Sequence, residues 1–551
     1  DDAPSAATDL HVQFAAAATA GQLSFTAPTT TYGGSALSGE FSYNVYVNDA
    51  APLTGKVNAG SSAVVPVQAR EGMNTFVVTL TNAAGASPKA RLSAYAGYDT
   101  PKPIEKLTLN VDAARRADLI WTAPTATEHG GFLGALTYDL IRITGTDTTQ
   151  VANGISDVHF AEVLPEGPLM GYRYAVRAHN QSQVTTWTNS NNAVVGSPIE
   201  PPFFDEFANA ADAELYTVID NNNDQASWAW DKDPYTEQTA YRYHWSDTEK
   251  ADDWLLLPPL RLRAGTVYTF QFKAKSNGTD YTERFEVKWG QAPNPAGLTT
   301  VILNPTEVST DEYQTFTNEL HPQADGTYYI GFHALSDAGG YYLHIDSVSI
   351  AAPIAAAAPA AAENLKGKAD PSGKLLTTLT FDAPKLKVDG TTLSNIERIE
   401  VRNGLRLVKA FTQPAPGASL TATDNRATTG DNVYTVIAFN ADGAGAAATK
   451  NIYVGQDQPA TPVIAAEDLT NAVRLSWPAV GGANGGFVIP EEVTYNIYNV
   501  RDGGYRGDLI ATVTGGKTEY VVPDQKTAEG NQRYAQWAIS AKNKAGESGY
   551  G

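Results

Sequence analysis

The hexapeptide LIWTAP at residues 119–124 has three counterparts in this chain: LSFTAP at 23–28, LTFDAP at 379–384 and LSWPAV at 475–480. Alternating apolar and polar residues followed by proline predict a short strand that runs into a loop. The aromatic residues Phe25 and Trp121 lie 96 positions apart, and so do Phe381 and Trp477. A unit of about one hundred residues is therefore repeated, twice on each side of a different middle segment.

Further features recur in the same order in each unit. Two adjacent residues that include at least one glycine follow the hexapeptide in each unit. A predicted strand in which apolar and polar residues alternate comes next. A later strand starts with an aromatic residue and ends in an asparagine, at Asn82, Asn180, Asn440 and Asn543. Period-two alternation, glycine-rich turns and this length predict a seven-stranded antiparallel β-sandwich.

These units resemble fibronectin type III domains. The resemblance rests on the early aromatic residue, on the strand that ends in asparagine and on a third-strand tyrosine at Tyr43, Tyr138 and Tyr495. In the third unit Ile396 and Ile399 stand near the tyrosine position, so the assignment of this unit rests on its beginning and its end. The resemblance implies a fold and hardly any function.

Residues 201 to about 352 form a segment of different composition, which holds five of the nine tryptophans. Its segment VYTFQFKAK at 267–275 places Tyr268, Phe270, Phe272 and Ala274 on one face of a strand, and 284–290 and 327–335 alternate in the same way. Faces this aromatic must be covered by a second sheet, which predicts a two-sheet jelly roll.

Four landmarks of this middle segment resemble, in order, the cleaved-adhesin (choice-of-anchor J, MAM-like) jelly-roll domains of secreted proteins of anaerobic bacteria. They are FFDEF at 203–207, LYTVIDNNNDQASWAW at 215–230, DDWLLLPPLRL at 252–262 and GTYYIGFHALSDAGGYYLHIDSVSI at 326–350. The resemblance implies a binding or spacer module that often holds structural calcium and does not catalyse a reaction. Members commonly carry an acidic residue after the phenylalanine of the first strand, where this chain has Ala208 after Phe207.

We therefore expect an all-β chain with four fibronectin type III-like β-sandwiches and one central jelly-roll β-sandwich. The predicted domains are 1–98, 99–199, 200–352 (the jelly roll), 353–456 and 457–551. The fourth sandwich ends eight residues after Asn543, which is too short for a seventh strand. We expect its final strand to be truncated and the parent chain to continue with that strand and a second jelly roll.

Composition limits the partners and the compartment. The 551 residues include no cysteine, which excludes disulfides, a thiolate nucleophile and thiolate-bound metal clusters. A net charge of −21 repels nucleic acid. No apolar stretch is long enough to span a membrane. The resemblance to the cleaved-adhesin domains implies an extracellular or cell-surface bacterial protein, and we expect it to be a monomer.

One loop has the ligand spacing of a calcium site. Calcium takes six to eight oxygen ligands, and side-chain oxygens at every second position can surround one point. The candidate ligands are Asp220, Asn222 and Asp224, with Asp205, Glu206 and Asp346 converging on them if the first and last strands are neighbours. The alternative is a solvated turn, because Asn and Asp favour turns for backbone reasons alone.

Aromatic residues between 228 and 254 could provide a platform for sugar rings. Most of them are expected in the core, since aromatic residues on one face of a strand contribute the largest apolar surface that a sandwich has to bury. The candidates for a glycan-binding surface are Trp230, Tyr235 and Tyr241, with Asp231 and Asp233 available to hydrogen-bond sugar hydroxyls.

Motifs of known enzyme classes are absent, and adjacent strand residues such as Asp252 and Asp253 should point to opposite faces. We expect no catalysis but a binding or adhesion protein whose jelly roll contacts a glycan or a host or extracellular protein. The alternatives are a structural stalk or accessory region of a larger secreted hydrolase, and a glycan-cleaving enzyme that uses the jelly roll.

Overall fold

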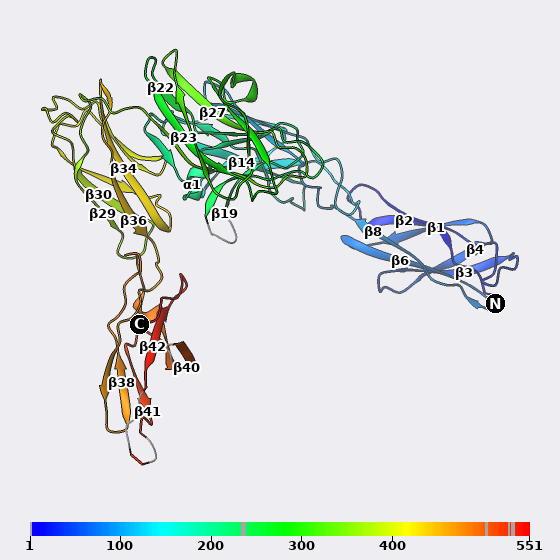
Figure 1. Ribbon diagram of the computed structural model, residues 1–551. Helices are drawn as coiled ribbons and strands as arrows, with labels where there is room; N and C mark the ends of the chain where they lie inside the picture. Colours follow the sequence, from blue (N-terminus) through cyan, green and yellow to red (C-terminus); the bar gives the residue numbers. More distant parts are fainter. Residues whose placement is uncertain (1–2, 233–237, 502–504, 527–528, 531–534) are drawn as a thin grey trace. The chain divides into compact units, whose positions relative to one another are not determined.

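The computed structural model describes residues 3–232, 238–501, 505–526, 529–530 and 535–551. Regular structure in these residues is almost entirely β-strand, with a short helix α1 (Ala210–Ala213) and 3-10 turns at Pro295–Gly297 and Pro490–Glu492 (Figure 1). The chain is all-β, as the sequence predicts. It divides into two units, 1–196 and 197–551, each of which is described by itself.

The first unit contains two pairs of antiparallel sheets. The first pair joins β1 (Thr8–Phe14), β2 (Ala20–Thr26) and β5 (Ser62–Gln68) in one sheet and β4 (Leu53–Asn58), β3 (Glu40–Val47), β6 (Gly72–Asn82), β7 (Gly85–Ala86) and β8 (Ala90–Ala96) in the other. The second pair joins β9 (Leu107–Val111), β10 (Arg116–Trp121) and β13 (His159–Val163) in one sheet and β12 (Asp147–Ile155), β11 (Thr137–Thr144), β14 (Met170–His179), β15 (Thr188–Asn189) and β16 (Ala193–Val195) in the other.

In the second unit, residues 203–351 form two six-stranded sheets. One contains β17 (Phe203–Asp205), β19 (Trp228–Lys232), β20 (Thr239–Tyr243), β28 (Leu343–Ala351), β23 (Tyr268–Lys275) and β26 (Gln314–Leu320). The other contains β18 (Thr217–Asp220), β21 (Asp253–Leu256), β22 (Leu260–Leu262), β27 (Gly326–Ala334), β24 (Glu283–Gly290) and β25 (Thr300–Val308).

Aromatic side chains from the two sheets meet between them. The Phe272 ring of β23 contacts the rings of Phe285 in β24, at 6.0 Å between centroids, and of Phe332 in β27, at 4.9 Å. These side chains are buried, as the period-two alternation of their strands predicts. The middle segment is thus a two-layered β-sandwich, which we call the jelly roll.

Two further pairs of sheets follow the jelly roll. The first has β29 (Glu363–Ala369), β30 (Thr377–Asp382) and β33 (Ser419–Asp424) opposite β32 (Arg406–Thr412), β31 (Arg398–Asn403), β34 (Gly430–Asn440), β35 (Gly443–Ala444) and β36 (Ala448–Val454). The last has β37 (Ala465–Asp468), β38 (Ala472–Ser476) and β41 (Glu519–Pro523) opposite β40 (Tyr505–Val513), β39 (Thr494–Arg501) and β42 (Trp537–Lys542).

The repeated aromatic residue has the same role in each sandwich. Trp121 packs edge-on against Tyr138 across the two sheets, with 5.3 Å between ring centroids. The corresponding pairs are Phe25 with Tyr43 and Trp477 with Tyr495. In the third sandwich, which lacks the tyrosine, Phe411 of β32 supplies the ring that contacts Phe381, at 5.9 Å. A neighbouring strand therefore fills the space that the absent tyrosine would leave.

The last residues of the chain lie beside β42. Gly551 exchanges two backbone hydrogen bonds with Ile539, and the Ser548 backbone N–H donates to the Ala541 carbonyl. In the first three sandwiches β8, β16 and β36 pair with the strand that corresponds to β42. Among the described residues, no helix has the length and apolarity that a membrane crossing requires.

Candidate metal centre and ligand-binding surface

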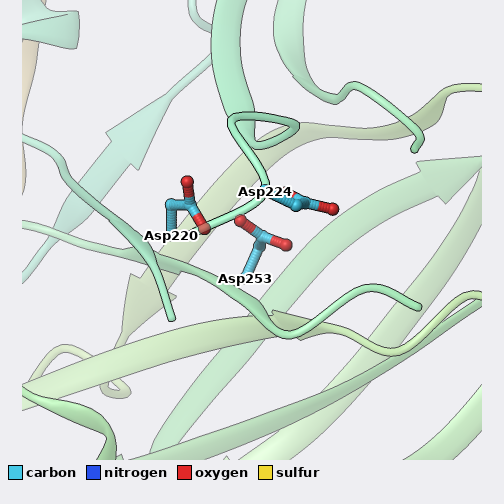
Figure 2. Close-up of side chains that lie close together, drawn as sticks. All are labelled: Asp220, Asp224 and Asp253. Carbon is cyan, nitrogen blue, oxygen red and sulfur yellow. The ribbon is translucent and has the colours of Figure 1, made fainter. Parts of the chain in front are cut away.

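Three carboxyl groups of the jelly roll converge at one end of its second sheet. The side chains of Asp220, Asp224 and Asp253 each offer an oxygen within 4.8 Å of the others. Figure 2 shows the carboxyl groups of Asp220 and Asp253 facing one another, with Asp224 beside them. We call these three residues the aspartate cluster.

Strand pairing brings two of the three aspartates together. Asp220, the last residue of β18, lies directly opposite Asp253, the first residue of β21. Directly opposed residues of antiparallel strands project to the same face, so the two carboxyl groups are close although 33 positions separate them. The loop after β18 adds Asp224, turning back through the left-handed residues Asn223 and Gln225.

The aspartate cluster contains oxygens that nothing in the described chain satisfies. Asp220 Oδ1, Asp224 Oδ2 and Asp253 Oδ1 are buried and accept no hydrogen bond from the described residues. Asp253 has no solvent-exposed surface. Burial raises the pKa of Asp253 to about 7, and the negative charges of Asp220 and Asp224 act in the same direction. Three crowded carboxylates of this kind fit a hard divalent cation that prefers oxygen ligands.

Asn222, the remaining candidate ligand of this loop, is tied to the segment before β21. Its side-chain amide nitrogen donates a hydrogen bond of 2.9 Å to the carbonyl of Lys250. Asn221 likewise donates to the carboxylate of Asp252, at 2.6 Å. These two amide hydrogen bonds attach the loop to the residues just before β21.

The other three predicted metal ligands do not belong to the aspartate cluster. Asp205 ends β17 and Asp346 lies in β28, and these two strands pair with each other, so the first and last strands are neighbours. Both strands belong to one sheet, whereas Asp220 and Asp253 lie in the other. The carboxyl group that joins the loop is therefore that of Asp253, which the sequence analysis did not select.

Asp205, Glu206 and Asp346 form a second acidic group. Asp205 is buried and accepts hydrogen bonds from the Phe207 backbone N–H and the Tyr216 hydroxyl, both at 2.8 Å. Burial raises the pKa of Asp205 to about 6 against the effect of these hydrogen bonds, and the charges of Asp346 and Glu206 raise it further. Two donors from the protein already occupy this carboxylate.

The structure corrects one predicted ligand-binding residue. Tyr241 is buried, contacts the rings of Phe207 and Tyr216, and donates its hydroxyl to the carbonyl of Ala213 at 2.8 Å. Its prediction as a glycan contact is wrong, because Tyr241 faces the interior from β20 and a sandwich buries such rings. Tyr235 and Asp233 lie outside the described residues.

Trp230 and Asp231 of β19 are partly buried and already engaged. The Trp230 indole donates a hydrogen bond of 2.7 Å to the carbonyl of Phe207. Asp231 accepts from His244 at 2.7 Å and pairs with Arg242 at 3.0 Å. Both side chains therefore have protein partners that a ligand would have to replace.

A surface group of aromatic rings lies on other loops of the jelly roll. The Trp245 ring lies against Tyr341, with 4.4 Å between centroids and 31° between planes, and Tyr281 stacks on Tyr341 at 5.0 Å and 27°. We call Trp245, Tyr341 and Tyr281 the aromatic ladder. Tyr281 is 39 % exposed, and the other two rings are partly exposed. Trp245 is one of the aromatic residues between 228 and 254 considered as a sugar platform, but it was not among the selected candidates. Tyr281 and Tyr341 were not predicted, although Tyr341 and Tyr342 follow a Gly-Gly pair, a turn signal.

Buried polar contacts hold the aromatic ladder in place. Glu283, which has no exposed surface, accepts a hydrogen bond of 2.6 Å from the Tyr341 backbone N–H. A Cβ atom at Gly340 would lie 2.9 Å from Glu283 Oε1, so a larger residue there would displace this carboxylate. The Arg242 guanidinium lies over the neighbouring Tyr342 ring, 4.8 Å from its centroid.

One histidine of the jelly roll lies between two carboxylates. His333 Nδ1 is 2.8 Å from Glu286 and Nε2 is 2.8 Å from Asp252, while the ring stacks on Trp254 with 4.0 Å between centroids. Asp252 and Asp253 indeed point to different partners, as alternation along a strand predicts. Both ring nitrogens are used within the protein, so this group fits a structural role.

No protein-family model matches the sequence, and no curated protein matches it. Among solved structures, the chain is similar to the K1 cleaved adhesin domain of Lys-gingipain from Porphyromonas gingivalis W83. The identity is 20 %, the TM-score is 0.24, and the match covers 28 % of this chain and 99 % of that one.

Two further solved structures are similar to parts of the chain. The CBM22-1 xylan-binding domain of Paenibacillus barcinonensis Xyn10C is 8 % identical with a TM-score of 0.21, over 27 % of this chain and 92 % of that one. The glycoside hydrolase domain of Endo-D from Streptococcus pneumoniae R6 is 11 % identical with a TM-score of 0.22, over 43 % of this chain and 37 % of that one. Each of these similarities covers only a part of the chain, and we infer no activity, ligand or partner from them.

Proposed function

We propose that this chain is a non-catalytic binding protein of the bacterial cell surface or extracellular space. In this proposal the jelly roll contacts a glycan or an extracellular protein, and the four sandwiches, which we take to be fibronectin type III-like, act as spacers. The observation that supports a binding role is the aromatic ladder, because rings that are partly exposed and held by buried partners suit a contact surface.

We further propose a structural calcium ion at the aspartate cluster. Asp220, Asp224 and Asp253 would hold it, and the ion would supply the positive charge that their unsatisfied oxygens lack. The ion would fasten the loop after β18 to the start of β21, since the three ligands come from these two places. Its role would be to order this end of the jelly roll.

The second candidate is a structural stalk or accessory region of a larger secreted hydrolase. The repeated sandwiches favour this candidate, because a stack of similar modules positions a functional domain without itself binding a ligand. The two candidates differ in whether the chain binds anything when it is alone.

A binding experiment on the whole chain separates the two candidates. The labelled chain, in millimolar calcium, is applied to a glycan array and to immobilised extracellular proteins such as fibronectin and collagen. Saturable binding to one class of ligand is expected. Absence of binding to every member of both sets, by a chain whose unfolding transitions are intact, would support the stalk and refute the binding role.

A further inference from the structure

We propose that the aromatic ladder is the contact surface for a glycan, and specifically for a neutral one. This inference rests on the proposed function, since it names the ligand class and the residues through which the jelly roll would bind. It differs from the sequence-based prediction, which placed the glycan near Trp230, Tyr235 and Tyr241.

Three loops of the jelly roll bring the three rings together. Trp245 follows β20, Tyr341 lies two residues before β28, and Tyr281 lies in the loop that joins β23 to β24, two residues before β24. The strands β20, β28 and β23 are neighbours in one sheet, whereas β24 belongs to the other sheet. Tyr341 contacts both other rings, with centroid distances of 4.4 Å to Trp245 and 5.0 Å to Tyr281.

The ladder lies outside the aromatic core. The core rings, such as Phe270 and Phe272, are fully buried between the two sheets, whereas the ladder rings keep part of their surface in water. Tyr281 forms one end of the ladder, with Tyr341 against one of its faces. Because water contact with apolar rings is unfavourable, a ligand that covers them gains free energy.

A pyranose ring has the complementary chemistry. One side of the sugar carries C–H groups that can stack on an aromatic ring, while the hydroxyls at its rim need hydrogen-bond acceptors. The three loops that carry the ladder, 244–250, 276–282 and 336–342, supply exposed carboxylates at Asp247, Glu249, Asp280 and Asp337. A carboxylate accepts hydrogen bonds and is well suited to hydroxyl donors.

The charge around the ladder favours a neutral glycan over an anionic one. The same three loops contain four acidic residues and one lysine, Lys250. Arg242, whose guanidinium lies over the neighbouring Tyr342 ring, is paired with Asp231. The chain as a whole carries a net charge of −21. Sulfated, sialylated or uronate-rich glycans would be repelled at this surface, whereas uncharged hexose or pentose polymers would not.

The surface is also ordered before any ligand arrives. The Trp245 indole donates to Asp247 at 3.1 Å, and the Gly339 backbone N–H donates to the Ser246 carbonyl at 2.8 Å, which joins two of the three loops. The Tyr341 backbone N–H donates a hydrogen bond to the buried carboxylate of Glu283. A site built in advance spends less of its binding free energy on ordering side chains.

The test compares variants of the full chain in affinity electrophoresis, with gels that contain xylan, yeast mannan or laminarin as neutral probes and heparin or alginate as anionic probes. The variants are Tyr281→Ala and Trp245→Ala. Trp187→Ala removes an exposed tryptophan from the second sandwich and is the matched control, and Trp230→Ala tests the sequence-based site. Calorimetric unfolding of each variant establishes that the jelly roll is folded.

We expect at least one neutral polysaccharide to retard the wild-type chain. Tyr281→Ala and Trp245→Ala should each weaken this binding by about tenfold or more, since each substitution removes one of the rings on which a sugar would stack. Trp187→Ala and Trp230→Ala should bind like the wild type.

Four outcomes would overturn the inference, and they differ in what they say about the proposed function. Retardation by heparin or alginate alone, or neutral binding that survives both ladder variants, would refute the ladder but leave a glycan-binding function. Binding only to fibronectin or collagen on the protein panel would refute the glycan and leave a protein-binding function. Absence of binding to any probe would refute both proposals.

Discussion

The side-chain amide of Asn180 donates a hydrogen bond of 2.8 Å to the backbone carbonyl of Asp99, 81 positions earlier in the chain. The same amide donates to the carbonyl of Leu133 at 2.9 Å. Asn543 makes the equivalent bond to Asp457, and Asn440 makes one to Ala357. The asparagine that ends a repeated strand thus fastens that strand to the segment entering the same sandwich.

Replacing this asparagine should destabilise its sandwich. Asn180→Ala leaves the carbonyls of Asp99 and Leu133 without their donor in a buried position, which should cost about 1–3 kcal/mol of unfolding free energy. Differential scanning calorimetry of the whole chain should show one transition moved to lower temperature. Asn110→Ala, at an exposed position of β9, is the control and should change stability by less than ~0.5 kcal/mol. Equal effects of the two substitutions would contradict this role.

Acid should weaken the second sandwich through Asp99. Burial acts to raise the pKa of Asp99, but hydrogen bonds from the His129 side chain and from the Gly131 and His129 backbone N–H groups lower it to about 2. A lowered pKa stabilises the fold above the ordinary value near 4, and this contribution disappears as the pH falls from about 4 towards 2. The expected loss is on the order of 1–2 kcal/mol.

Calorimetry between pH 2 and pH 5 measures this loss. Asp99→Asn should be less stable than the wild type at pH 5 and should approach it at pH 2, since protonation has then removed the same charge from the wild type. Asp49→Asn, at an exposed position, should follow the wild type throughout. A constant difference between Asp99→Asn and the wild type over this range would argue against the titration of Asp99.

Calcium should stabilise the jelly roll through the aspartate cluster. A ligand that binds only the folded state at 100 times its Kd adds about 2.7 kcal/mol. In the calorimeter, calcium should therefore raise the jelly-roll transition of the wild type by several degrees relative to a chelator. Asp253→Asn should abolish the response, because it removes the most buried of the three carboxylates.

Two further variants define where the ion binds. Asp311→Asn, an exposed aspartate of the same domain, should respond to calcium like the wild type. Asp205→Asn should also keep the response. Loss of the response in Asp205→Asn and not in Asp253→Asn would place the ion at the first and last strands instead.

Truncating the central ring of the jelly roll should cost far more than truncating an exposed one. Phe272 contacts the rings of Phe270, Phe285, Phe316 and Phe332, and Phe272→Ala should lower the unfolding free energy by about 3–5 kcal/mol. Phe204, which is 57 % exposed, provides the matched control. Similar calorimetric shifts for Phe272→Ala and Phe204→Ala would contradict the proposed core.

Short-range patterns were sufficient to predict the strands and much of the core. Alternation at period two identifies the face of a strand that is buried, and Phe25, Trp121, Phe381 and Trp477 are all buried as their hexapeptides predict. The repeat also placed an asparagine at the end of the corresponding strand in each unit. It could not show that Asn180 reaches Asp99, because a hydrogen bond across 81 positions depends on how the strands are arranged.

The candidate sites were decided by tertiary structure. Asp253 joins Asp220 because β18 and β21 pair in one register, and a shift of one residue would send their side chains to opposite faces. The contacts among Trp245, Tyr341 and Tyr281 depend on three loops that the fold brings together, one after β20, one before β28 and one between β23 and β24. Alternation is a local property that can be read from the sequence alone. Strand order and register depend on how the whole sandwich packs, and the same packing buries Tyr241 in the interior.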